Sequence, residues 1–163
     1  MPDAEGKVEL AQRFQRILWP TDFSAFARIA LPHVHGLVRR NEAGLVLLHV
    51  LTPAEADVEP GITGQIWDSL LVEGRRRAEA QLALLAEELQ SLGVRVETLL
   101  GEGVAFQEIL RVAERQRCDL IILASHGRTG LGHVLIGSVA EKVVRRASCP
   151  VFVVRPPGVV PPD

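Results

Sequence analysis

LIILASHGRTGLGHVLIGS, residues 120–138, contains in one stretch an apolar run, a long loop and the beginning of a helix. Its first five residues, 120–124, carry no polar side chain, which is typical of a strand that is covered on both faces. The loop that follows includes four glycines, two histidines and one arginine but no acidic residue. This pattern predicts a buried strand that leads through a flexible, electropositive loop into a helix.

Apolar strand patterns and amphipathic helix patterns alternate on either side of this unit. The sequence predicts strands at residues 15–19, 45–51, 94–100, 120–124 and 150–154, and helices at about 24–40, 65–91, 106–113 and 139–147. Ser24 is the expected N-cap of the first helix. Pro32 lies inside that helix and removes a hydrogen bond, so we expect a kink or two shorter helices.

Strict alternation of this kind predicts an α/β fold: a single open five-stranded parallel sheet with helices on both faces. Ligands of such sheets bind beyond the carboxyl ends of the strands, where the strand order reverses. The loops that follow the first, second and fourth strands are therefore the candidates for a binding site. They read PTDFS, HVLTP and SHGRTGLGHVLIGS.

The composition excludes several classes of protein. Apolar residues make up 47%, charged residues 23%, and the net charge is −2, so no overall field favours nucleic acid or anionic membrane. No apolar run approaches the roughly 18 residues that cross a bilayer, and the first residues lack the pattern of a secretory signal. We expect a cytoplasmic protein. Cys118 and Cys149 fit no metal or redox spacing and are expected to be reduced, buried thiols.

The glycine loop has the chemistry of an anion site. A helix N-terminus carries unsatisfied N–H groups and a partial positive charge, which suit a phosphate. Gly137 and Ser138 bring two N–H groups and a hydroxyl to the helix start, and Arg128 adds a charge-assisted contact. The loop is no Walker motif, since His133 stands where the lysine belongs.

The alternative interpretation is a flexible connector. Ser138 and Glu141 fit a capping box, so we expect Ser138 to cap its helix in either case. The length of the loop argues against a mere connector, because loops this long are usually functional or disordered. A zinc site is not expected, because His126 and His133 have no carboxylate or thiol nearby. His49 lies within the apolar second strand and is expected to be a core histidine with its polar atoms satisfied.

Three motifs give the chain a resemblance to a known family: ILWPTDFS at 17–24, LLHV at 47–50 and ASHGRTGLGHVLIGSVAEKVVRRASCPVFVV at 124–154. Over nearly all of residues 14–155 it resembles the universal stress protein family. The resemblance implies a Rossmann-like, adenine nucleotide alpha hydrolase-like sheet with strand order 3-2-1-4-5. The expected domain spans 14–155, between an N-terminal extension, 1–13, and a proline-rich mobile tail, 156–163.

The resemblance also implies a nucleotide site. Nucleotide-binding members carry a Gly-2x-Gly-9x-Gly-Ser/Thr pattern that holds the phosphates of ATP. Here the pattern falls on Ala124, Gly127, Gly137 and Ser138, so alanine replaces the first glycine and adds one methyl group at a strand end. Asp22 would bind ribose or adenine, and Mg²⁺ would be held mainly by the phosphates. The implied set is Pro20, Asp22, Val50, Ala124, Ser125, His126, Gly127, Arg128, Gly137, Ser138 and Val139.

The expected function is that of an ATP-binding stress-response protein that acts through nucleotide-dependent interaction with a regulatory protein. It is not expected to be a fast enzyme, because the glycine loop offers no general base. The alternatives are a slow ATP hydrolase, an enzyme that cleaves ATP at the α-phosphate, or a member that has lost nucleotide binding. An α-phosphate-cleaving enzyme would have a glycine-serine loop where this chain reads PTDFS. A flavin-binding electron carrier would need flanking aromatics, and the chain has no tyrosine.

The last strand predicts a homodimer. Val151, Phe152, Val153 and Val154 form a short apolar strand at an edge of the expected sheet, and an uncovered edge of this kind promotes aggregation. Antiparallel pairing with the same strand of a second subunit would satisfy its backbone and bury Phe152. The family that the chain resembles commonly associates in this way. The alternative is a monomer in which the proline-rich tail covers the edge.

Overall fold

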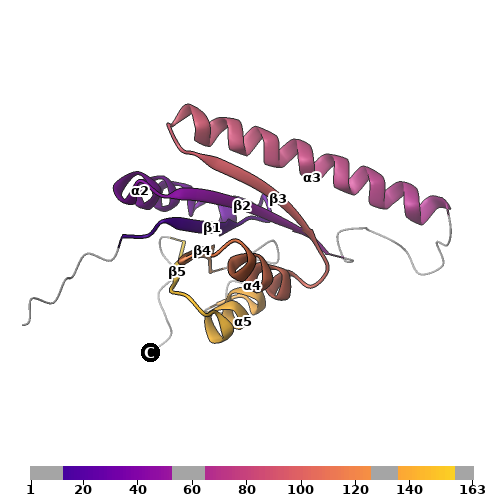
Figure 1. Cartoon of the computed structure of the whole chain (residues 1–163). Helices are drawn as coiled ribbons and strands as arrows, with labels where there is room; N and C mark the ends of the chain where they lie inside the picture. Colours follow the sequence, from indigo (N-terminus) through magenta and orange to yellow (C-terminus); the bar gives the residue numbers. More distant parts are fainter. Residues whose placement is uncertain (1–12, 53–64, 126–135, 157–163) are drawn as a thin grey trace, which may run out of the picture.

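The computed structural model describes residues 13–52, 65–125 and 136–156. Within these ranges the chain forms one parallel sheet with the strand order β3-β2-β1-β4-β5 (Figure 1). The strands are β1 (Arg16–Pro20), β2 (Gly44–Leu51), β3 (Val96–Glu102), β4 (Leu120–Ala124) and β5 (Val151–Val154). This order and the parallel direction confirm the predicted fold class. The predicted N-terminal extension and proline-rich tail lie almost wholly outside the described residues.

Within the described ranges, five helices connect or follow these strands. They are α1 (Ala25–Arg28), α2 (Leu31–Asn41), α3 (Gln65–Ser91), α4 (Ala105–Arg115) and α5 (Ser138–Arg146). Figure 1 shows α3 on one side of the sheet and α4 and α5 on the other. None of the helices in the described ranges combines the length and the apolar character that crossing a membrane requires.

Helices cover both faces of the sheet, which explains the long apolar runs of β2 and β4. On one face, Ile17 and Trp19 of β1 pack with buried residues of α2 and α3. On the other face, Leu18 packs with buried residues of α4 and α5. Because successive residues of a strand point to opposite faces, all three of these side chains are fully buried.

The predicted first helix is divided into two shorter helices, which is one of the two outcomes expected from Pro32. The α1 helix ends at Arg28, and Pro32 occupies the first turn of α2, where its missing N–H is not needed. Ser24 is the N-cap of α1, and its Oγ accepts a hydrogen bond of 3.1 Å from the Ala27 N–H. The predicted cap is therefore confirmed.

The third strand starts two residues later than the sequence predicts. Val94 lies beyond α3 but is still bonded to its last turn: its N–H donates to the Leu89 carbonyl at 3.1 Å, after Gly93 has taken a positive φ of 79°. Pairing with β2 begins only at Val96, which lies opposite Leu45. At its other end, β3 continues through Gly101 and Glu102 because β2 extends far enough to pair with them.

The β5 strand lies at an edge of the sheet, paired with β4 along one side. Phe152 in this strand is 41% exposed. Its ring lies beside that of His33 on α2, with 5.7 Å between the ring centroids. The structure thus confirms that the last strand is an edge strand of the described sheet with an exposed aromatic side chain.

Candidate functional site

The carboxyl ends of β1, β2 and β4 lie together at one end of the sheet. Strand pairing places Pro20 of β1 opposite Leu48 of β2, and Leu18 of β1 opposite Ile121 of β4. Residues that follow these strands therefore lie at the same end of the molecule, together with the start of α5. The strand order reverses here, between β1 and β4, which is the place where ligands of such sheets bind.

The turn after β1 is fixed by consecutive hydrogen bonds. Thr21 continues the ladder, because its N–H donates to the Leu48 carbonyl at 2.8 Å. The Phe23 N–H donates to Thr21 Oγ1 and the Ser24 N–H donates to Asp22 Oδ1, each at 3.0 Å. Phe23 adopts a left-handed φ of 60°. Asp22, which is half-buried, is thereby held in one orientation between β1 and α1.

His49 of β2 contacts this turn from the neighbouring strand. The imidazole is 3% exposed, and its Nδ1 lies 2.7 Å from the Thr21 carbonyl oxygen. Since that oxygen can only accept, Nδ1 must carry the hydrogen. The ring also lies against the Phe23 ring, with the centroids 4.4 Å apart. The prediction of a satisfied core histidine is confirmed, and the histidine proves to be tied to the β1 turn.

Ser125, which follows β4, links that strand to both β5 and α5. Its N–H donates to the Val154 carbonyl at 2.7 Å, and its carbonyl accepts from the Gly137 N–H at 2.6 Å. Ser125 is fully buried. The two ends of the glycine loop are therefore joined by a main-chain hydrogen bond. His126, Gly127 and Arg128, which the sequence analysis placed in the site, lie outside the described residues.

The predicted capping box at Ser138 is wrong. Gly137 is the N-cap of α5, with extended backbone angles (φ −68°, ψ 155°), and its carbonyl accepts the first helical bond from the Glu141 N–H at 2.9 Å. Ser138 is already the first helical residue, so its hydroxyl does not cap the helix. Glycine is one of the residues preferred at N-caps. It has no side chain that could cover the N–H groups of the first turn.

This arrangement also changes the expected donors. The Gly137 N–H, which the sequence analysis assigned to an anion, is used by Ser125. The N–H groups of the first turn of α5 remain without a side-chain cap among the described residues, and they lie at the positive end of the helix dipole. The start of α5 therefore keeps the chemistry of an anion site, with one donor fewer than predicted.

The family is decided by comparison with known proteins. The model of the universal stress protein family matches residues 13–155. This chain belongs to the universal stress protein family. Universal stress protein MJ0577 of Methanocaldococcus jannaschii is 32% identical over 154 residues, covering 87% of this chain and 95% of the relative. Universal stress protein YxiE of Bacillus subtilis is 30% identical over 148 residues, covering 87% of this chain and 99% of the relative.

Solved universal stress proteins share the fold. The structure of MJ0577 superposes with a TM-score of 0.80 at 33% identity, covering 90% of this chain and 99% of that one. UspA of Lactobacillus plantarum superposes with a TM-score of 0.74 at 24% identity, covering 89% and 100%. These two comparisons agree with the sheet order described above.

In this universal stress protein, the predicted site residues that the structure describes all lie at the carboxyl end of the sheet. They are Pro20, Asp22, Val50, Ala124, Ser125, Gly137, Ser138 and Val139. Thr21 and Phe23 also belong to the β1 turn of this site, although they were not among the residues predicted from the sequence. Their signal was the TDFS segment itself, in which Thr, Asp and Ser are the side chains that most often bond to a turn backbone.

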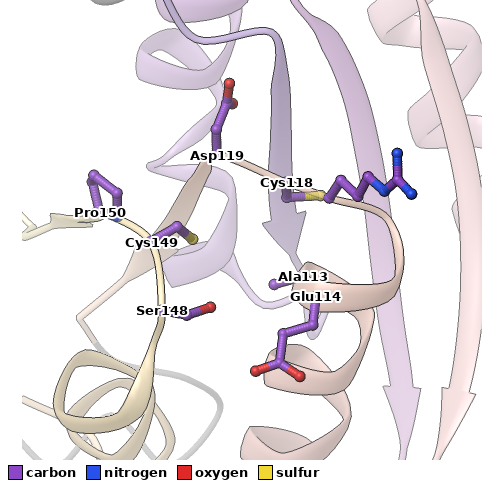
Figure 2. Close-up of a pocket in the computed structure, with 8 residues that line it drawn as sticks. Ala113, Glu114, Cys118, Asp119, Ser148, Cys149 and Pro150 are labelled. Carbon is purple, nitrogen blue, oxygen red and sulfur yellow. The ribbon is translucent and has the colours of Figure 1, made fainter.

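A hollow in the surface of the described residues lies at the opposite, amino end of the sheet of this universal stress protein. It has a volume of about 450 Å³ and is open. Figure 2 shows that Cys118 and Asp119, before β4, and Ser148 and Cys149, before β5, line it from two separate turns. Burial raises the pKa of the Cys118 thiol to about 11 and also raises that of Cys149.

Both thiols of this hollow are free. Cys118 is buried as predicted, whereas Cys149 is only half-buried, because it lies in the turn before the edge strand β5. No group of three or more His, Cys, Asp or Glu side chains is arranged to hold a metal ion among the residues that the structure describes.

Proposed function

We propose that this universal stress protein binds ATP at the carboxyl end of its sheet and acts through nucleotide-dependent interaction with a regulatory protein. The observation that carries the proposal is the start of α5, which has no side-chain cap among the described residues and which the Gly137–Ser125 hydrogen bond fixes beside the end of β4. Asp22 is held in the turn that follows the adjacent strand β1. An anion site beyond β4 and a carboxylate beyond the neighbouring strand β1 suit the two ends of a nucleotide.

In this proposal the triphosphate binds at the start of α5 and along the glycine loop, and the nucleoside binds near the β1 turn. Asp22 accepts hydrogen bonds from ribose or adenine, and Pro20 and the backbone at Val50 frame the base. Any Mg²⁺ would be held mainly by the phosphates, because the donors at the start of α5 suit anions. The Ala124 side chain adds a methyl group where the family pattern has glycine, at a half-buried strand end.

Two further solved proteins with this fold were determined with an adenine nucleotide bound. One is a universal stress protein in complex with cAMP (TM-score 0.58, 20% identity), and the other is the universal stress protein of Archaeoglobus fulgidus in complex with dAMP (TM-score 0.62, 19% identity). At these identities they share the fold alone with this chain. The proposal for this protein therefore depends on its own residues.

We propose binding rather than rapid turnover. The residues from 124 to 138 include no acidic side chain, and Asp22 already accepts a hydrogen bond from the Ser24 N–H. The segment 124–138 therefore offers no carboxylate to activate a water molecule for attack on the γ-phosphate, and the Asp22 carboxylate is engaged in the β1 turn. Steady-state phosphate release should accordingly be far slower than the roughly 10 s⁻¹ that is the median for enzymes.

The homodimer through β5 and a cytoplasmic location belong to the same proposal. The exposed Phe152 on the edge strand supports the homodimer, since pairing of two such edges would cover it. The two free thiols are consistent with a reducing compartment.

The test is calorimetric titration of ATP into the wild type and into Gly137→Val. Because Gly137 has an extended backbone that any residue adopts, valine should leave the fold intact while it crowds the phosphates, and binding should be lost. Gly36→Val is the matched control, since a Cβ at Gly36 meets no atom within 4 Å. Wild-type affinity in Gly137→Val would remove the start of α5 from the site.

A further inference from the structure

The β1 turn is held from β2 on both sides of Asp22. The residue before it, Thr21, has its N–H bonded to the Leu48 carbonyl and its own carbonyl bonded to His49 Nδ1. The residue after it, Phe23, lies with its ring against the His49 ring. Leu48 and His49 of β2 therefore hold the backbone of Thr21, and His49 also packs against the side chain of Phe23.

Phe23 needs such support because its backbone is unfavourable. A φ of 60° is disfavoured for a residue with a Cβ atom and persists only where the surroundings determine it. Here the Phe23 N–H bonds to Thr21 Oγ1 and the ring rests on His49. Loss of the ring contact with His49 would make the left-handed backbone conformation of Phe23 less stable. A change of its φ would turn Ser24 and release its hydrogen bond to Asp22.

His49 itself is too deeply buried to serve as a surface for a ligand, with 3% of its area exposed. Its influence on a bound molecule must therefore pass through the residues that it holds. Asp22 lies between those residues, and the turn joins β1, which pairs with β4 on its other side. The distance between Asp22 and the start of α5 thus depends on a rigid β1 turn.

We propose that His49 and Phe23 are positioning residues that hold the Asp22 carboxylate in the orientation that recognises the nucleoside part of the ligand. This inference rests on the proposed function, and it assigns the pair no contact with the phosphates. A nucleotide that is bound at both ends requires a fixed separation between the two subsites. The His49–Phe23 pair supplies that rigidity at the nucleoside end.

The experiment measures separately how the nucleoside and the phosphate parts of the ligand bind. ATP, adenosine and inorganic tripolyphosphate are each titrated into the wild type, Phe23→Leu and Phe23→Tyr. Leucine keeps the apolar volume but loses the flat ring, whereas tyrosine keeps the ring on a half-buried residue. We expect Phe23→Leu to weaken the binding of ATP and adenosine by about tenfold, the effect of a misdirected hydrogen bond to a charged group. Tripolyphosphate binding should not change, and Phe23→Tyr should behave as the wild type does.

A double-mutant cycle identifies the route of the effect. If Phe23 acts through Asp22, adding Phe23→Leu to Asp22→Ala should cause no further loss of ATP affinity. His49→Phe, which keeps the ring contact and loses the hydrogen bond to Thr21, provides a second variant in case Phe23→Leu fails to fold. It should weaken the binding of ATP and adenosine in the same way.

The outcomes distinguish this inference from the proposed function. A wild type that binds no ATP overturns the proposed function. A wild type that binds ATP, together with Phe23→Leu or His49→Phe variants of unchanged affinity, overturns the positioning role alone. Equal losses for adenosine and tripolyphosphate would mean that the pair only maintains the fold, which also refutes the positioning role.

Discussion

Replacing Phe152 by serine tests the proposed homodimer most directly. The phenylalanine side chain is 41% exposed on the edge strand β5, and pairing of two β5 strands would cover it. Burial of a phenylalanine removes about 200 Å² from water, so roughly 80 Å² remains to be buried in each subunit. At about 25 cal/mol per Å², this contributes roughly 2 kcal/mol per subunit and about 4 kcal/mol per dimer.

Serine retains little of this area. We therefore expect Phe152→Ser to raise the dissociation constant of the dimer by roughly a thousandfold. Sedimentation equilibrium over a range of protein concentrations measures the constant. Leu84→Ser is the matched control, because Leu84 is 66% exposed on α3, which packs on β2 and β3 at the other edge of the sheet. An unchanged constant for Phe152→Ser would refute the reasoning, and a wild type that is monomeric at micromolar concentration would refute the dimer itself.

Two further predictions concern the core and the thiols. Ile122→Ala should lower the free energy of unfolding by about 2–5 kcal/mol in urea titrations, because Ile122 is fully buried in β4; a loss below about 1 kcal/mol would contradict that packing. Burial raises the pKa of Cys118 from 9.0 to about 11, so the unfolded chain loses this proton first as pH rises. The stabilisation that the neutral thiol contributes should be complete below pH 9 and lost towards pH 11, and Cys118→Ala should reduce this loss in the same titrations.

The strands were predictable where both faces of the sheet are covered. The run of residues 45–51 contains apolar residues at every position but His49, and such a run has few alternatives to a buried strand. Local chemistry also located the Ser24 cap and the break at Pro32, since each depends on residues within one turn of helix. These features need no knowledge of distant contacts.

The missed features depend on contacts between residues that are far apart in the sequence. The spacing of Ser138 and Glu141 fits a capping box, but the bond from the Gly137 N–H to the Ser125 carbonyl starts α5 one residue earlier. The partners of His49 follow from the register of β1 against β2, which places Pro20 opposite Leu48. A pattern within one segment does not determine the register between two.

The hydrogen bond between Ser125 and Gly137 has a consequence for how the family can vary. It fixes both ends of the segment 126–136 at one point of the sheet, where Ser125 is also bonded to Val154. Lengthening a segment with fixed ends costs little, about 0.6 kcal/mol for each doubling if it is flexible. Insertions or exchanges there leave β4 and α5 where they are. The bond between Ser125 and Gly137 therefore holds β4 and α5 together independently of the residues that a related protein carries between those two positions.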